Sequence, residues 1–217
     1  SLLLYGVLKI AFGGALVSTY IQQITLFSFI VIITSLGLNV IYGYTGQFSL
    51  GHAAFYGIGA YASAWISKSA GIESSLAFLP VLLASGLVSA AIGCVVGIPV
   101  LRLKDDFLAI ATLGFGIFAR VIFDNSERLP EVLGGSRGFI ANPVLSYLEV
   151  TLSVTAFLIL VTGNLIRSRY GLFWRCIRED ELAAASVGVD TARMKLLAFT
   201  FGCFLAGIGG GLYAHLY

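Results

Sequence analysis

The sequence has 217 residues, of which 58% are apolar and 11% carry a charge, and its mean hydropathy is +0.95. Soluble globular chains average roughly 45–50% apolar and about 25% charged residues. A soluble domain of this length cannot bury so much apolar surface, so the composition excludes a soluble globular protein and indicates a membrane protein. The formal net charge of +2 says little about partners, but the placement of the charges is informative.

Long apolar segments predict about seven membrane-spanning helices. A helix needs about 20 apolar residues to cross ~30 Å of hydrocarbon, and the segments lack the alternating pattern of barrel strands. We therefore expect an all-α, polytopic transmembrane helix bundle that forms a single permease domain over residues 1–217. The predicted spans are 2–17, 22–42, 53–67, 75–100, 107–123, 148–166 and 196–217.

Basic residues predict the orientation of these spans. Segments 101–106 and 167–195 hold eight of the thirteen Lys and Arg residues. Positively charged loops stay in the cytoplasm, so both segments are expected there, and the two spans between them are consistent with this. The loops expected on the other side, 68–74 and 124–147, hold only Lys68, Arg128 and Arg137.

Small residues recur at a spacing of four in two of the spans. Such stripes let helix backbones approach closely in lipid, so they predict tight packing within a bundle rather than a ligand site. One stripe is Ser85, Ser89, Gly93 and Gly97, and the other is Gly207 and Gly211 beside Gly202, Ala206 and Gly210.

Motifs for enzymatic chemistry are missing from the sequence. GIGAYA (57–62) and GFGIFA (114–119) fit the dinucleotide fingerprint, but both lie in predicted spans and neither follows a strand. No phosphate-binding loop is present, so another polypeptide must bind ATP if transport is energised. The histidines stand alone, and the three cysteines are interpreted as apolar fillers. We expect no enzyme, no metal site and no cofactor.

Arg120 is the one charged residue well inside a later predicted span. Asp124 follows four residues on, within reach of an i, i+4 ion pair. We interpret the two as an interfacial pair near the outer end of the span. No series of intramembrane Asp, Glu or His suggests a proton relay.

The stretch GYTGQFSLGHAAFYG (43–57) is polar but uncharged, and it lies in an interval from Ile10 to Ile66 without Asp, Glu, Lys or Arg. Irregular backbone at membrane depth persists only when buried in protein or lining a wet cavity. The stretch predicts either a broken helix beside a polar solute or a short loop at a membrane face, whose side chains satisfy their own backbone. The candidate route-lining residues are Gly43, Gly46, Gln47, Ser49, Gly51 and His52.

A second informative segment, 170–188, alternates apolar and charged residues and predicts an amphipathic cytoplasmic helix that ends near Gly188. One face of this helix could dock on a partner. An interfacial helix on lipid is the alternative, but the consecutive acids Glu179 to Glu181 suit an anionic membrane surface poorly.

This segment resembles the coupling loop of ABC importer permeases, whose pattern is E-A-A-x-x-x-G. Ala183, Ala184 and Gly188 fit, although Leu182 stands at the glutamate position and Glu181 lies one place early. Further motifs agree in order and spacing, and with them the chain resembles the branched-chain amino acid ABC permease family, in particular its M-type subunit. They are LGLNVIYGYTGQFSLGHAAFYGIGAY (36–61), RLKDDFLAIATLGFG (102–116), GGSRGF (134–139) and IREDELAAASVGV (177–189).

The resemblance implies a multi-pass permease of the bacterial inner membrane that imports hydrophobic amino acids. It implies a second homologous permease, two cytoplasmic ATPases that bind the ATP, and a periplasmic or lipid-anchored binding protein. It also implies further sequence beyond both ends of this chain. Permeases for urea or short amides share the motifs, and an autonomous carrier or channel and a membrane scaffold remain alternatives. The implied coupling residues are Arg175, Arg178, Glu179, Asp180, Glu181, Ala183, Ala184 and Gly188.

Overall fold

The computed structural model describes residues 19–71, 75–101, 105–125 and 148–216. Every regular element in these ranges is a helix, which confirms the all-α class. The predicted span 2–17 and the motif GGSRGF lie outside the described residues. The elements are α2 (Thr19–Leu38), the π-helix η1 (Asn39–Tyr44), α3 (His52–Ala70), α4 (Ser75–Val100), α5 (Asp105–Asp124), α6 (Leu148–Arg167), α7 (Arg169–Glu179), α8 (Glu181–Ser186) and α9 (Thr191–Tyr213).

Five of the described helices are long and apolar enough to cross a membrane. They are α2 continued by η1, α4, α5, α6 and α9, and each coincides with a predicted span. The predicted span 53–67 is also a helix, α3, but its many Gly, Ala and Ser residues make it less apolar, and it is not one of the five. The bundle is therefore as predicted, and seven was an approximate count of its spans.

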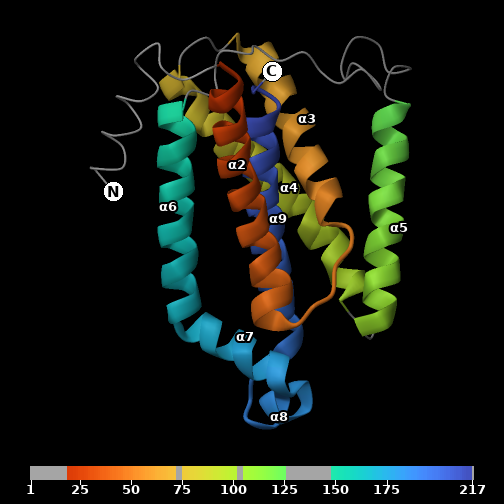
Figure 1. Cartoon of the computed structure of the whole chain (residues 1–217). Coiled ribbons are helices and arrows are strands. Elements are labelled where there is room, and N and C mark those ends of the chain that lie inside the picture. The colour runs from red at the N-terminus through yellow and green to blue at the C-terminus, as the bar shows by residue number, and fades with distance from the viewer. Residues whose placement is uncertain (1–18, 72–74, 102–104, 126–147, 217) are drawn as a thin grey trace.

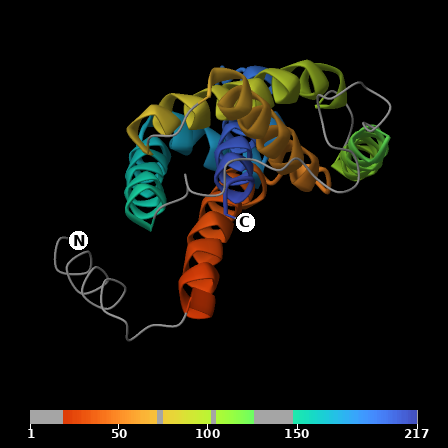
Figure 2. The same cartoon turned by 90° about the horizontal axis from the view of Figure 1, so that it is seen from above.

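Helix α9 lies in the middle of the bundle, with α5 and α6 on opposite sides (Figure 2). It packs against α2, α3 and α4 through a face of glycines. A Cβ on Gly207 would lie 2.5 Å from Ser89 Cβ of α4, and a Cβ on Gly59 of α3 would collide with the Gly207 backbone. The predicted small-residue stripes thus allow three helices to approach α9 closely.

Serine hydroxyls join the same helices by hydrogen bonds. Ser89 Oγ donates to the Phe55 carbonyl oxygen at 3.0 Å, which ties α4 to α3, and Ser85 Oγ lies 3.4 Å from the carbonyl oxygen of Gly207. Both serines are fully buried, so each hydroxyl needs such a partner inside the bundle.

The basic residues described in the structure gather mostly at one end of the bundle. Figure 1 shows α7 and α8 across this end, together with the end of α4, the start of α5 and the start of α9. Segment 167–195 therefore shares one side of the bundle with the ends of α4 and α5 that flank residues 102–104. The ion pair of Arg120 and Asp124, 3.6 Å from Nε to Oδ2, lies on α5 near the opposite end, as predicted.

Candidate functional site

The helix formed by α2 and η1 ends in a turn at Gly46, at the same end of the bundle as α7 (Figure 1). Gly46 has a φ of +73°, in the left-handed region that glycine adopts without steric cost. The Gly46 amide donates to the Tyr42 carbonyl at 3.1 Å, and the Gln47 amide donates to the Ile41 carbonyl at 3.2 Å. The helix thus closes in a hydrogen-bonded turn.

Residues 45–51 then run back into the bundle before α3 begins. His52, the first residue of α3, has Nε2 3.1 Å from the Thr34 carbonyl oxygen of α2. Thr34 precedes the end of η1 by ten residues, or roughly 15 Å of helix. The Leu50 amide meanwhile donates to Thr112 Oγ1 of α5 at 3.1 Å. The sequence left two alternatives, a broken helix inside the bundle and a short loop at a membrane face. The backbone has the shape of the broken helix, because the loop extends into the bundle and contacts α2 and α5.

Four polar side chains of this stretch are buried. Thr45 donates to the Ile41 carbonyl, and the other three are Gln47 (1% exposed), Ser49 (8%) and His52 (7%). One atom of each, Gln47 Oε1, Ser49 Oγ and His52 Nδ1, has no hydrogen-bond partner among the described residues. Leaving such a group unpaired costs about 1–3 kcal/mol. These three atoms lie within six residues of the chain, whereas the others among the described residues are the separate hydroxyls of Thr151, Thr162 and Thr200.

The hydrogen bond at His52 fixes which ring nitrogen can accept. A carbonyl oxygen only accepts, so Nε2 must carry the proton that is donated to Thr34. In the neutral ring Nδ1 is then a bare acceptor. Gln47 is similar, because its Nε2 donates to the Lys195 carbonyl at 3.2 Å and leaves the acceptor Oε1 free. The unpaired groups are therefore two acceptors and one hydroxyl.

The other two glycines of the predicted route differ, because Gly51 faces backbone atoms and Gly43 faces only the tip of a side chain. A Cβ on Gly51 would collide with the carbonyl oxygen of Thr112, so this glycine lets the loop touch the α5 backbone. A Cβ on Gly43 would collide with Asn39 Oδ1 within η1. The sequence predicted the glycines but gave no sign of Thr112, because that contact joins residues 62 positions apart.

The segment 170–188 is two helices, so the predicted single amphipathic helix is wrong. Helix α7 ends at Glu179, and α8 begins at Glu181. Asp180 lies between them in an extended conformation, and its Oδ1 accepts from the amides of Leu182 (2.8 Å) and Ala183 (3.0 Å). Aspartate is a preferred N-cap residue, so it starts a new helix here and ends the previous one.

Gly188 ends α8 in a Schellman motif. Its φ is +88°, its amide donates to the Ala185 carbonyl, and the Val189 amide donates to the Ala184 carbonyl. The two alanines predicted to be coupling residues differ in burial, because Ala184 is buried and Ala183 is exposed. The large apolar side chains that are exposed on α8 and just after it are Leu182 (81%) and Val187 (79%).

A shallow cleft of about 410 Å³ opens between α7 and α8. It collects most of the residues that the sequence assigned to coupling, and its walls are mainly apolar. Arg175 also bonds to the end of α6, with Nη2 donating to the Ile166 carbonyl at 3.4 Å. The residues that line the cleft are Arg175, Cys176, Glu179, Asp180, Ala183, Ala184 and Val187.

The structure joins the two segments that the sequence treated separately. Arg178 Nη1 of α7 donates to the Gly43 carbonyl at 2.6 Å. Trp174, which the sequence analysis missed, packs with Val40 of η1 and Ala198 of α9, and its Nε1 donates to the Met194 carbonyl at 3.0 Å. A large aromatic residue with a polar edge in an amphipathic segment was the available signal.

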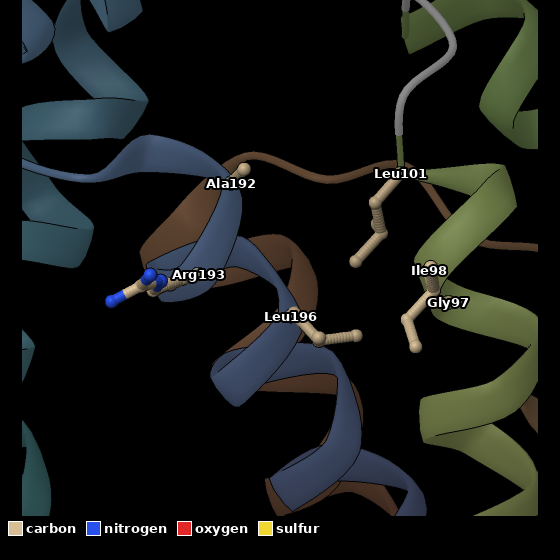
Figure 3. A pocket seen from close by; sticks show the side chains of 6 residues that line it. All are labelled: Gly97, Ile98, Leu101, Ala192, Arg193 and Leu196. Carbon is tan, nitrogen blue, oxygen red and sulfur yellow. The ribbon is translucent and has the colours of Figure 1, made fainter.

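A second cleft, of about 160 Å³, lies between α4 and α9 near the same end (Figure 3). Gly97, Ile98, Leu101 and Leu196 form most of its wall, and the charged tip of Arg193 points away from α4. Arg193 Nε pairs with Asp190 at 2.9 Å. The walls of this cleft are mainly apolar and offer few hydrogen-bonding groups, so we do not assign the solute to it.

His215, the second histidine, is not alone in the fold. It is fully buried near the end of α9, where Nδ1 lies 2.9 Å from the Gly211 carbonyl oxygen and Nε2 2.9 Å from Ser67 Oγ. Its ring also contacts Phe78, at 4.5 Å between centroids. Both nitrogens therefore have partners, and His215 is a packing residue that joins α3, α4 and α9.

Comparison with known proteins agrees with the motifs. Residues 20–217 match the family model described as the permease component of branched-chain amino acid transport systems. The permease protein LivM of the high-affinity branched-chain amino acid transport system of Salmonella typhimurium is 36% identical over 88% of this chain and 52% of its own length. LivM of Escherichia coli is 35% identical over 92% of this chain and 53% of its own length.

The permease protein LivH of the Salmonella typhimurium system is more distant, at 26% identity over 84% of this chain and 66% of its own length. No solved structure matches the chain. The chain spans about half the length of the LivM relatives. Since the family model covers almost all of it, the chain belongs to the permease family of branched-chain amino acid transport systems.

Proposed function

We propose that the chain is a membrane subunit of an ATP-driven importer that moves branched-chain amino acids across the bacterial inner membrane. The names of its LivM and LivH relatives support this substrate class. The partners would be a second, homologous permease, two cytoplasmic ATPases and a periplasmic or lipid-anchored binding protein. ATP would be bound by the ATPases, and this chain would need no cofactor and perform no enzymatic step. Transport would proceed by alternating access, in which ATP shifts a two-state equilibrium.

The observation that carries the proposal is the set of unpaired groups at Gln47, Ser49 and His52. The ammonium group of an amino acid brings three N–H donors and no acceptor. Two bare acceptors and a hydroxyl match such a donor, and their lack of formal charge lets them hold it weakly. A fixed charge would instead trap a zwitterion or repel one of its ends.

The segment 170–188 is proposed as the ATPase-coupling element. It lies at the end of the bundle where the basic residues gather, and it presents Leu182, Val187 and the cleft between α7 and α8. Exposed apolar side chains beside a cleft are typical of a surface that binds a protein partner. The acids at 179–181 favour a protein over an anionic lipid surface.

Reconstitution tests the function directly. The full-length protein, with its second permease in liposomes, should take up radiolabelled leucine only when the ATPases, the binding protein and ATP are all present. Uptake without ATPases would indicate an autonomous carrier or channel. ATP-dependent uptake of urea or a short amide, but not of leucine, would change the substrate class and leave the importer mechanism in place.

A further inference from the structure

We infer that Arg178 is a positioning residue that fastens the coupling segment to the polar loop, so that a displacement of α7 is passed directly to residues 43–52. This inference rests on the proposed importer function. It goes beyond it by naming the connection between ATPase docking and the solute-lining stretch. The connection is made by hydrogen bonds of described residues at the end of the bundle where α7 and α8 lie.

The first part of the connection is the contact of α7 with η1. Arg178 Nη1 donates to the Gly43 carbonyl at 2.6 Å, across 135 positions of sequence. A charge-assisted bond of this length is among the stronger hydrogen bonds in proteins. Trp174, one turn earlier on α7, packs on Val40 of the same π-helix. Two contacts, one polar and one apolar, therefore bind α7 to η1.

Gly46 completes this contact on the other side of the turn. A Cβ at position 46 would lie 3.4 Å from Arg178 Cγ, so the loop backbone rests on the arginine stem. The positive φ of Gly46 also allows the sharp change of direction between η1 and the loop. The guanidinium group of Arg178 thus binds Gly43 before the turn, and the aliphatic part of its side chain contacts Gly46 at the turn.

A second connection runs from α8 through the start of α9. Glu181 Oε2 accepts from Lys195 Nζ at 2.6 Å, and the carbonyl oxygen of Lys195 accepts from Gln47 Nε2 at 3.2 Å. The Lys195 side chain is only 13% exposed, so this ion pair is better shielded than a surface pair. The polar loop is thereby held by both helices of the coupling segment.

The π-helix η1 is a point at which the chain between α2 and the loop can bend. Its wider i→i+5 hydrogen bonding is rare, and such turns occur mostly at functional positions. Here the π-helix separates the α2 helix from the loop, and α7 contacts it as well as α6, α8 and α9. Movement of α7 can displace η1 and the loop while α2 stays packed against α9 and α6.

The test follows the loop itself in the assembled complex. Leu50, half exposed in the loop, is replaced by cysteine in a background where Cys94, Cys176 and Cys203 are alanine. Its labelling rate by a small maleimide is compared between the nucleotide-free complex and the complex trapped with ATP and vanadate. We expect the rate to change with nucleotide in the parent, and this change to shrink about tenfold in Arg178→Met, as for the loss of one charged hydrogen bond.

Arg169→Met is the matched control, because it removes the same charge from the same helix at an exposed position outside the coupling residues. It should keep the parental change, and Arg178→Lys, which retains one donor, should restore part of it. Gly46→Ala keeps Arg178 but strains the left-handed turn that rests on the arginine stem, so it should reduce the change even if Arg178→Met fails to assemble.

The outcomes separate the inference from the function. ATP-dependent leucine uptake by the parent, together with an undiminished labelling change in Arg178→Met and Gly46→Ala, overturns the inference and leaves the importer intact. A parent whose loop labels at the same rate in both nucleotide states also overturns it. Loss of ATPase binding in Arg178→Met, measured by co-purification, would make Arg178 a docking residue instead. Absence of ATP-dependent uptake in the parent rejects the function itself.

Discussion

His52 Nε2 lies 3.1 Å from the carbonyl oxygen of Thr34, so the first residue of α3 is fastened to the C-terminal part of α2. This bond has two consequences. It fixes the depth at which the chain resumes its helix after the polar loop. It also leaves Nδ1 as a buried acceptor without a partner among the described residues.

The two roles of His52 can be separated by two substitutions. His52→Gln places an amide nitrogen near the Nε2 position and removes the acceptor at Nδ1, so it should fold normally and lower leucine uptake by about tenfold. His52→Asn mimics Nδ1 and loses the bond to Thr34, so it should lower the unfolding temperature. Uptake and thermal unfolding of the purified complexes are the measurements. Equal effects of both substitutions on both measurements would contradict the separation.

Conservative changes in the polar loop test whether it lines the solute route. Gln47→Leu removes the acceptor Oε1, and Ser49→Ala removes a hydroxyl without a partner among the described residues, so the folded state loses no bond at Ser49. We expect Ser49→Ala to leave expression, assembly and basal ATPase activity intact, and to reduce leucine uptake or alter substrate preference. Unchanged uptake in both variants, or joint loss of assembly and uptake, would make the loop purely architectural.

The orientation of the bundle can be checked by labelling from each side. Arg175 and Arg178 are exposed on α7, the helix at the basic end, and each is replaced by cysteine in turn. In a background without native cysteines, including the exposed Cys176, the introduced cysteines should react with membrane-impermeant reagents only from the cytoplasmic side. Reaction in intact cells with the reagent outside would reverse the topology.

Docking of the ATPases should depend on the exposed apolar residues of α8. Leu182→Glu puts a charge at an 81% exposed position, so the permease should fold while ATPase co-purification falls by about tenfold or more. Gly188→Trp should also uncouple transport. Because Gly188 has a φ of +88°, however, any larger residue there also strains the backbone. Leu182→Glu is therefore the cleaner test, and unaltered assembly and uptake would remove the coupling assignment.

Close packing around α9 predicts a selective effect of alanine. A Cβ on Gly210 would collide with the Tyr56 carbonyl oxygen of α3, so Gly210→Ala should lower stability by about 1–3 kcal/mol. Gly163→Ala on α6 is the control, because a Cβ there meets nothing within 4 Å. It should leave the unfolding midpoint unchanged or slightly raised. Equal stability of the two variants in detergent would contradict the packing of α3 on α9.

The sequence by itself determined the helical class, the positions of the described spans and the grouping of the basic segments at one end. These properties follow from local composition, because each apolar segment must satisfy its own backbone in lipid and each cluster of basic residues must stay on one side. The glycines and uncharged polar residues at 43–52 likewise marked a break in the helix before any contact was known.

Only the tertiary structure decided what the break touches. The sequence predicted one helix over 170–188, whereas the Asp180 cap divides it in two, and this placed Arg178 at the end of α7 beside Gly43. The pairing of Gln47 with Lys195, which leaves Oε1 of Gln47 unpaired, likewise joins residues 148 positions apart. Such contacts leave no periodic trace in the sequence, because one hydrogen bond between distant segments is set by how the helices pack and not by the residues beside either partner.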